Sequence, residues 1–95
     1  MVGSQWDIYW VSLDPSVGSE QAGRRPVLVV SSEIVNRALP LVTVVPLTSL
    51  KPGRVVYPTE ALLPAAITGL PKDSIAMAHQ IRTISRERLH EQCGC

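Results

Sequence analysis

The chain has 95 residues, of which 45% are hydrophobic and 18% charged, and its formal net charge is +1. This length predicts a single domain spanning residues 1–95, and the hydrophobic fraction excludes a disordered chain. A net charge this close to zero excludes a strongly basic protein that coats nucleic acid without specificity. The charge is uneven, however, because residues 23–54 hold five basic side chains and one acidic side chain. The middle of the chain is therefore suited to meet an anion.

Short β-branched runs separated by turn residues predict strands rather than long helices, and the eight prolines favour the same interpretation. In chain order, strands are expected at residues 7–13, 26–30, 41–47, 54–59 and 74–84. Alternation in the first strand places Ile8 and Trp10 on one face and Tyr9 and Val11 on the other. The run at 26–30 has no polar residue, which predicts a strand covered on both faces.

Helical segments are expected to be few and short. Ser31 or Ser32 is suited to cap a helical turn that ends before Pro40. Ser85 is suited to cap a helix over residues 86–91. Residues 51–54 read Lys-Pro-Gly-Arg, which predicts a type II turn joining two strands of a hairpin. At least five short strands with one or two helical turns predict a small, mostly antiparallel β-barrel.

Cysteine usage and hydropathy bear on cofactors and on location. Cys93 and Cys95 are too close in sequence to staple the fold. Two thiolates are half of a zinc site, and no nearby Cys–His pair completes it, so we expect neither a metal nor another cofactor. No apolar run approaches the ~18 residues of a membrane span, and the N-terminus does not have the pattern of a secretory signal. We therefore expect a soluble cytoplasmic protein with no membrane partner.

Three motifs occur in order: GSEQAGRRP at residues 18–26, PLTS at 46–49 and QIRTI at 80–84. Together they resemble the MazF/PemK (Kid) toxins of bacterial type II toxin–antitoxin systems. The resemblance implies an SH3-like antiparallel barrel that forms a homodimer and cuts single-stranded RNA without a metal, and an antitoxin as a partner. Relatives usually continue into an amphipathic C-terminal helix, so that helix is expected to be truncated or absent here.

The resemblance also assigns roles to particular residues. Arg25 matches the family's catalytic arginine, and Thr48 matches its catalytic threonine. Residues beside the active site or near the RNA groove in the family match Ser19, Glu20, Gln21 and Gln80. Arg24 is open to two interpretations, either a phosphate ligand or a solvated neighbour of Arg25.

The implied reaction is attack by the RNA's own 2′-OH on the adjacent phosphate, giving a 2′,3′-cyclic phosphate and a 5′-OH. The enzyme then has to stabilise charge, align the attack and transfer protons. A guanidinium suits the first task, but arginine stays protonated and is a poor general base. Histidine is a common base, but alternation places His79 opposite Gln80, where a core or interface position is expected. Water and Glu20 are the other candidates for the base.

Other side chains and other functions stay open at this stage. Trp6 and Trp10 are suited either to stack on bases or to pack in the core or an interface. Lys51 and Arg54, beside the predicted turn, either contact the RNA backbone or are solvated. One alternative function is a non-enzymatic toxin similar to CcdB, which poisons gyrase. Another is an inactive remnant that only binds an antitoxin.

Overall fold

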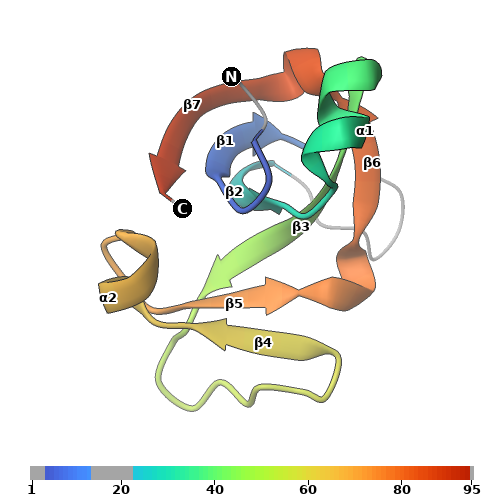
Figure 1. Ribbon diagram of the computed structural model, residues 1–95. Coiled ribbons are helices and arrows are strands. Elements are labelled where there is room, and N and C mark those ends of the chain that lie inside the picture. Colours follow the sequence, from blue (N-terminus) through green and yellow to red (C-terminus); the bar gives the residue numbers. More distant parts are fainter. Residues whose placement is uncertain (1–3, 14–22, 95) are drawn as a thin grey trace.

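The computed structural model describes residues 4–13 and 23–94. Within these ranges, strands dominate and the helices are short (Figure 1). The strands are β1 (Ile8–Ser12), β2 (Arg24–Val29), β3 (Leu41–Ser49), β4 (Glu60–Leu63), β5 (Ser74–Met77), β6 (Arg82–Ser85) and β7 (Leu89–Gly94). The helical elements are α1 (Glu33–Ala38), α2 (Ala65–Thr68) and the 3-10 turns η1 (Ala78–Gln80) and η2 (Arg86–Arg88).

The strands form one sheet in the order β4-β5-β3-β2-β1-β7, and β6 pairs with β3 outside this path. Every pairing is antiparallel, so the predicted mostly antiparallel β class is confirmed. The sheet is not closed, however, because β4 and β7 lie at its two ends and do not pair in the described part of the chain. In Figure 1, β3 runs from the part that contains β1, β2 and β7 to the part that contains β4 and β5. The expected barrel is therefore an open, bent sheet.

The two faces of the sheet bury separate apolar clusters. The first consists of Tyr9, Val11, Leu13, Val27, Val29, Val42, Val44, Ile84 and Leu89. The second consists of Ile8, Val45, Leu47, Leu70 and Ala76, with the partly buried Leu28, Val30, Leu63 and Cys93 against it. Strands β1 and β2 contribute alternate residues to both clusters, as their sequence patterns predicted. Each fully buried Val, Leu or Ile contributes about 1.5–3 kcal/mol relative to an exposed side chain.

The single strand predicted at residues 74–84 is wrong, because η1 divides it into β5 and β6. Both strands pair with the same edge of β3, since Leu47 lies opposite Ala76 and Val44 lies opposite Arg82. Between these pairs, two residues of β3 face five residues of the other chain segment. The extra residues form the turn at 78–80, next to Pro46, which has no N–H to donate to a ladder.

The helix predicted at residues 86–91 is also wrong. Ser85 does cap a turn, accepting a 3.3 Å hydrogen bond from the Glu87 backbone N–H, but the turn is η2 and only three residues long. The chain then continues as β7, which pairs with the outer edge of β1 and buries Leu89 opposite Val11. Sheet pairing and burial of this leucine thus override a weak local preference for helix.

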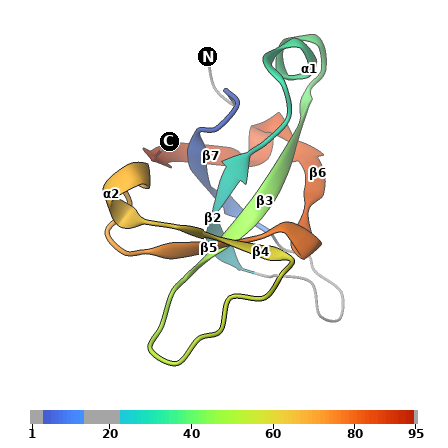
Figure 2. The same cartoon turned by 60° about the horizontal axis from the view of Figure 1, so that its bottom comes forward.

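The strand predicted at residues 54–59 is wrong as well, because this segment forms a loop that projects from the sheet (Figure 2). The predicted turn before it does form: Gly53 has a φ of +80°, and the Arg54 N–H donates to the Lys51 carbonyl at 3.0 Å. The loop is held by Glu60, whose carboxylate accepts from the Arg54 guanidinium at 2.7 Å and from the Tyr57 N–H at 3.0 Å. Strand β4 begins only at Glu60, where it pairs with β5.

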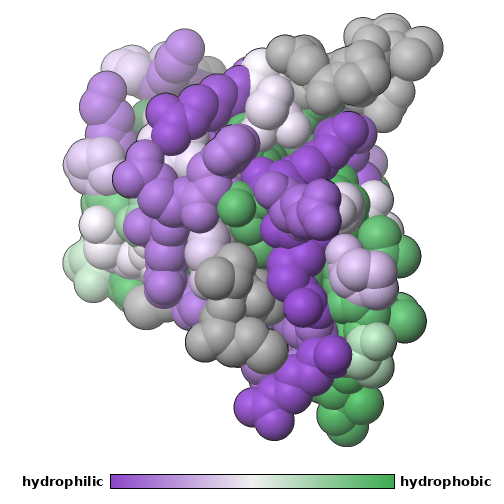
Figure 3. Space-filling model, turned by 90° about the horizontal axis from the view of Figure 1, so that it is seen from above, coloured by the Kyte–Doolittle hydropathy of each residue, from purple (hydrophilic) through white to green (hydrophobic). Residues whose placement is uncertain are grey.

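Helix α1 lies where a helical turn was predicted, with Ser32 as its N-cap. Asn36 anchors it to the sheet: this buried side chain donates to the Ser31 carbonyl at 2.9 Å, and the Ser31 hydroxyl accepts from the Thr43 N–H at 3.0 Å. Around the helix, apolar side chains are exposed, namely Ile34, Val35, Leu39 and Leu41. Figure 3 looks down on the end of the molecule that carries α1, where hydrophobic surface lies beside a hydrophilic band.

Candidate active site

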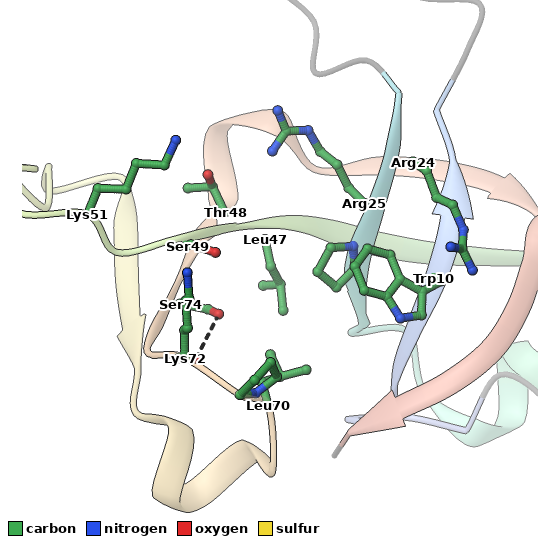
Figure 4. Close-up of a pocket in the computed structure, with 12 residues that line it drawn as sticks. Trp10, Arg24, Arg25, Leu47, Thr48, Ser49, Lys51, Leu70, Lys72 and Ser74 are labelled. Carbon is green, nitrogen blue, oxygen red and sulfur yellow. Dashed lines mark hydrogen bonds between the residues drawn. The ribbon is translucent and has the colours of Figure 1, made fainter.

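The candidate site lies where β3 separates from β2. The ladder between these strands runs from the Val29–Val44 pair to the Val27–Pro46 pair. From Leu47 onward β3 pairs with β5 on its other edge, so the edge that faced β2 has no partner strand among the described residues. The opening forms a pocket of about 510 Å³. It is lined by Trp10, Arg24, Arg25, Pro26, Leu47, Thr48, Ser49, Lys51, Leu70, Pro71, Lys72 and Ser74 (Figure 4).

Arg25 and Thr48 are brought to the same side of this opening. Each lies two residues beyond the last paired positions, Val27 and Pro46, and side chains two residues apart on a strand share a face. In Figure 4 both side chains point to one side of β3, together with Lys51. Both are half-buried, so the strands restrict their motion while their polar groups remain accessible. The two residues matched to catalytic positions therefore line the same pocket, and their catalytic roles stay a prediction.

The pocket lining is cationic. Arg24, Arg25, Lys51 and Lys72 contribute four positive charges, of which that of Arg24 is paired with Glu91, and none of the described residues that line the pocket carries a carboxylate. The nearby Asp73 is directed to α2, where its Oδ1 accepts from the Ala65 N–H at 2.8 Å. Since like charges gathered around a concave surface raise the local concentration of anions, the pocket is suited to a phosphodiester.

Arg24 differs from Arg25 in its contacts. Its guanidinium lies 5.0 Å from the centre of the Trp10 ring and forms a 3.1 Å ion pair with Glu91 of β7. Trp10 is half-buried and lines the pocket, whereas Trp6 is 57% exposed and does not. Of the two tryptophans that the sequence left open, only Trp10 therefore has a place at the site.

His79 and Gln80 lie on η1 rather than on a strand, so the alternation used to place them on opposite faces does not apply. His79 is exposed, with its Nδ1 3.3 Å from the Thr59 hydroxyl, so a core position is wrong, and the interface position expected as its alternative stays a prediction. Gln80 is half-buried and is not among the pocket residues. The structure thus does not bring either residue into the lining that holds Arg25 and Thr48.

Three predicted site residues, Ser19, Glu20 and Gln21, lie outside the described residues. The two ends of their segment are joined by a hydrogen bond from the Leu13 N–H to the Gly23 carbonyl at 2.9 Å. Sequence reasoning gave no site role to the wall formed by Leu70, Pro71, Lys72 and Ser74. The only signal for it was a lysine in the loop before a strand, and that signal does not show which strand edge the loop faces. Lys51, which was left open, lines the pocket, whereas Arg54 pairs with Glu60.

Comparison with known proteins identifies the family of the chain. Residues 4–95 match the model of the family described as "PemK-like, MazF-like toxin of type II toxin-antitoxin system". The chain belongs to this family. It is 38% identical over 92 residues to endoribonuclease EndoA of Bacillus subtilis, covering 97% of this chain and 78% of that protein.

Solved structures of the family have the same fold. MazF of Deinococcus radiodurans (Form-I) is 33% identical with a TM-score of 0.79, covering 99% of this chain and 81% of that one. A MazE–MazF structure (Form-II) from the same organism is 34% identical with a TM-score of 0.70, covering 99% and 80%. Within residues 4–13 and 23–94, no helix is long and apolar enough to cross a membrane.

Proposed function

We propose that this chain is a toxin endoribonuclease that cleaves single-stranded RNA at the opening between β2 and β3. The observation that carries the proposal is that Arg25 and Thr48 line one pocket whose described residues include four cations and no carboxylate. Family membership and the endoribonuclease EndoA as a relative support it. The family matched here, with its endoribonuclease relative, does not favour the gyrase-poisoning alternative.

In this proposal the nucleophile is the 2′-OH of the RNA. It attacks the adjacent phosphorus, the 5′-oxygen leaves, and the products are a 2′,3′-cyclic phosphate and a 5′-OH. Arg25 donates parallel hydrogen bonds to the phosphate oxygens, where negative charge increases in the transition state. The Thr48 hydroxyl donates one more. The 2′-OH proton goes to water or to Glu20, and the departing 5′-oxygen takes a proton from the Arg25 guanidinium or from water, so no step requires a metal.

The proposal includes partners and a location. An antitoxin is the expected inhibitor, since the family is defined by toxin–antitoxin systems and a MazE–MazF structure is among its relatives. A homodimer is the expected assembly, for which the exposed apolar side chains around α1 offer a contact surface. The molar mass of the protein in solution, measured by light scattering, tests whether it is a dimer. The proposed site of action is the cytoplasm, where mRNA is translated.

Arg25→Ala tests the function. Purified protein and single-stranded RNA are incubated with a chelator, and the RNA ends are mapped by primer extension. The wild type is expected to cut and Arg25→Ala to lose at least a hundredfold in rate, since removing one such donor typically costs 10²–10³-fold. Arg88→Ala, which removes an arginine of η2 outside the pocket, is the matched control and should cut normally.

The alternatives give different results in the same experiment. Full activity of Arg25→Ala contradicts the assigned site. Inhibition of gyrase supercoiling by the wild type without RNA cleavage supports the CcdB-like alternative. Antitoxin binding with neither activity supports an inactive remnant.

A further inference from the structure

The pocket has two chemically different halves. Arg25 and Thr48 project from one face of the sheet, where Lys51 joins them (Figure 4). Because side chains alternate along a strand, the neighbouring residues of β1, β2 and β3 project from the other face. That half is lined by apolar and aromatic groups, namely Trp10, Pro26, Leu47, Leu70 and Pro71. A phosphate ligand needs no such surface, and the proposed chemistry does not use it.

Trp10 is held at the wall of the pocket by its strand and by Arg24. Trp10 lies opposite Pro26 in the β1–β2 ladder, which fixes its backbone. In Figure 4 its ring lies between the Arg24 guanidinium and the centre of the pocket. Arg24 is 5.0 Å from the ring centre and is itself held by Glu91. Arg24 thus contacts the indole ring, and the ring itself lines the cavity.

The size and charge of this half fit one nucleotide. Pockets for small organic groups range from about 300 to 1,000 Å³, and this pocket lies in that range. Lys72, on the same wall as Leu70 and Pro71, is exposed and supplies a charge for a backbone phosphate. Unpaired bases stack on aromatic side chains, and the alternation of aromatic and basic groups is typical of single-strand binding.

We propose that the apolar half of the pocket is a base subsite: one unpaired base next to the cleaved phosphate stacks on Trp10, and Lys72 binds that nucleotide's phosphate. The subsite rests on the proposed RNA cleavage. It makes Trp10 a substrate-binding residue with no part in the proton transfers. Because stacking accepts any base, the subsite contributes affinity and position more than sequence preference.

The test measures binding to an RNA that the enzyme cannot cut. Wild-type cleavage is mapped first, and the probe is a short RNA over that site with a 2′-deoxy nucleotide in place of the attacking 2′-OH. Trp10→Leu is expected to raise the dissociation constant by about tenfold. Trp10→Phe is expected to restore most of the affinity. Trp6→Leu makes the same change away from the pocket and should bind as the wild type does.

Two further measurements separate stacking from a structural effect. Probes with one abasic nucleotide at each position are compared; the loss caused by Trp10→Leu should disappear on one of them, because no base is left to stack. Lys72→Gln should lower the slope of log affinity against log salt by about 0.7, the value for one phosphate of a single strand.

The outcomes distinguish the subsite from the function. If the wild type does not cut RNA, the proposed function fails and the subsite fails with it. If it cuts but Trp10→Leu binds normally, or loses the same factor on every abasic probe, the subsite is wrong and the function stands. Thermal unfolding shows whether Trp10→Leu is folded. If it is not, the abasic probes are compared with Trp10→Phe in its place.

Discussion

The two ends of β3 perform different tasks. Before Pro46, the strand pairs with β6 on one edge and β2 on the other, and Val42 and Val44 are buried in the first cluster. After Pro46, it pairs with β5 alone, and Thr48 and Ser49 line the pocket. The same strand is thus a core element for half its length and a site wall for the rest. Stability and activity should therefore respond to different substitutions within a few residues of each other.

The site half of this comparison is tested by Thr48→Val, which keeps the shape of the side chain and removes its hydroxyl. We expect kcat/KM for RNA cleavage to fall roughly 10- to 100-fold, since a hydrogen bond to a charged group contributes about 1.5–3 kcal/mol. Unfolding free energy should stay within about 0.5 kcal/mol of the wild type. A large loss of stability with normal cleavage would show that Thr48 belongs to the core half.

The core half is tested by Val44→Ala, four residues earlier on the same face. This substitution removes two buried carbon atoms and should lower the free energy of unfolding by about 1.5–3 kcal/mol. The Tm should fall by roughly 4–8 °C for each kcal/mol lost. Urea unfolding measures the first quantity. Cleavage by the folded protein, assayed well below the Tm, should stay within about twofold of the wild type. A selective loss of cleavage would contradict the division at Pro46.

The smallest expected effect concerns the loop between β3 and β4. The Arg54 guanidinium, and next the Tyr57 N–H, hold the pKa of Glu60 below its ordinary value, and the Glu60 side chain is only 1% exposed. A folded-state pKa that is lowered adds stability above the unfolded value of about 4.3, and this is lost as the pH falls through the folded value. Wild type should therefore be more stable than Glu60→Gln near neutral pH.

The difference between the two proteins should shrink as the pH falls below about 4, when Glu60 becomes protonated in both the folded and unfolded states. Thermal unfolding across this range measures it, with Glu87→Gln, an exposed carboxylate of η2, as the control. A constant difference at all pH values would mean that the ion pair does not respond to titration of Glu60.

The sequence predicted the parts of this fold that depend on local pattern. Alternation in β1, the apolar run of β2 and the Ser32 cap each report on one element and its immediate burial. The errors at residues 78–80 and 86–91 have another origin. Each depends on which strand edge is available as a partner, and that is decided by residues far away in the chain, such as Val11 for Leu89. At residues 54–59, the contacts of Glu60 with Arg54 and Tyr57 hold a loop that the strand pattern did not predict.

The same distinction applies to the site. Arg25 and Thr48 lie in motifs that a single sequence carries, so they could be proposed as site residues before the pocket was known. Leu70 and Lys72 could not, because they enter the pocket only when β5 pairs with β3 and carries the preceding loop along. His79 was misplaced for a related reason, since its face was inferred from an alternation that η1 interrupts.

The end of the β2–β3 ladder has a consequence for how such a site can change over generations. The opening begins where this ladder ends, at the Val27–Pro46 pair, and beyond that pair β3 is held by β5 on its other edge, so backbone pairing maintains the opening. Its walls come from separate stretches of chain, near residues 10, 24–26, 47–51 and 70–74. Apart from Arg25 and Thr48, side chains in each stretch can change while the opening persists, so new substrate preferences can arise one wall at a time without a new fold.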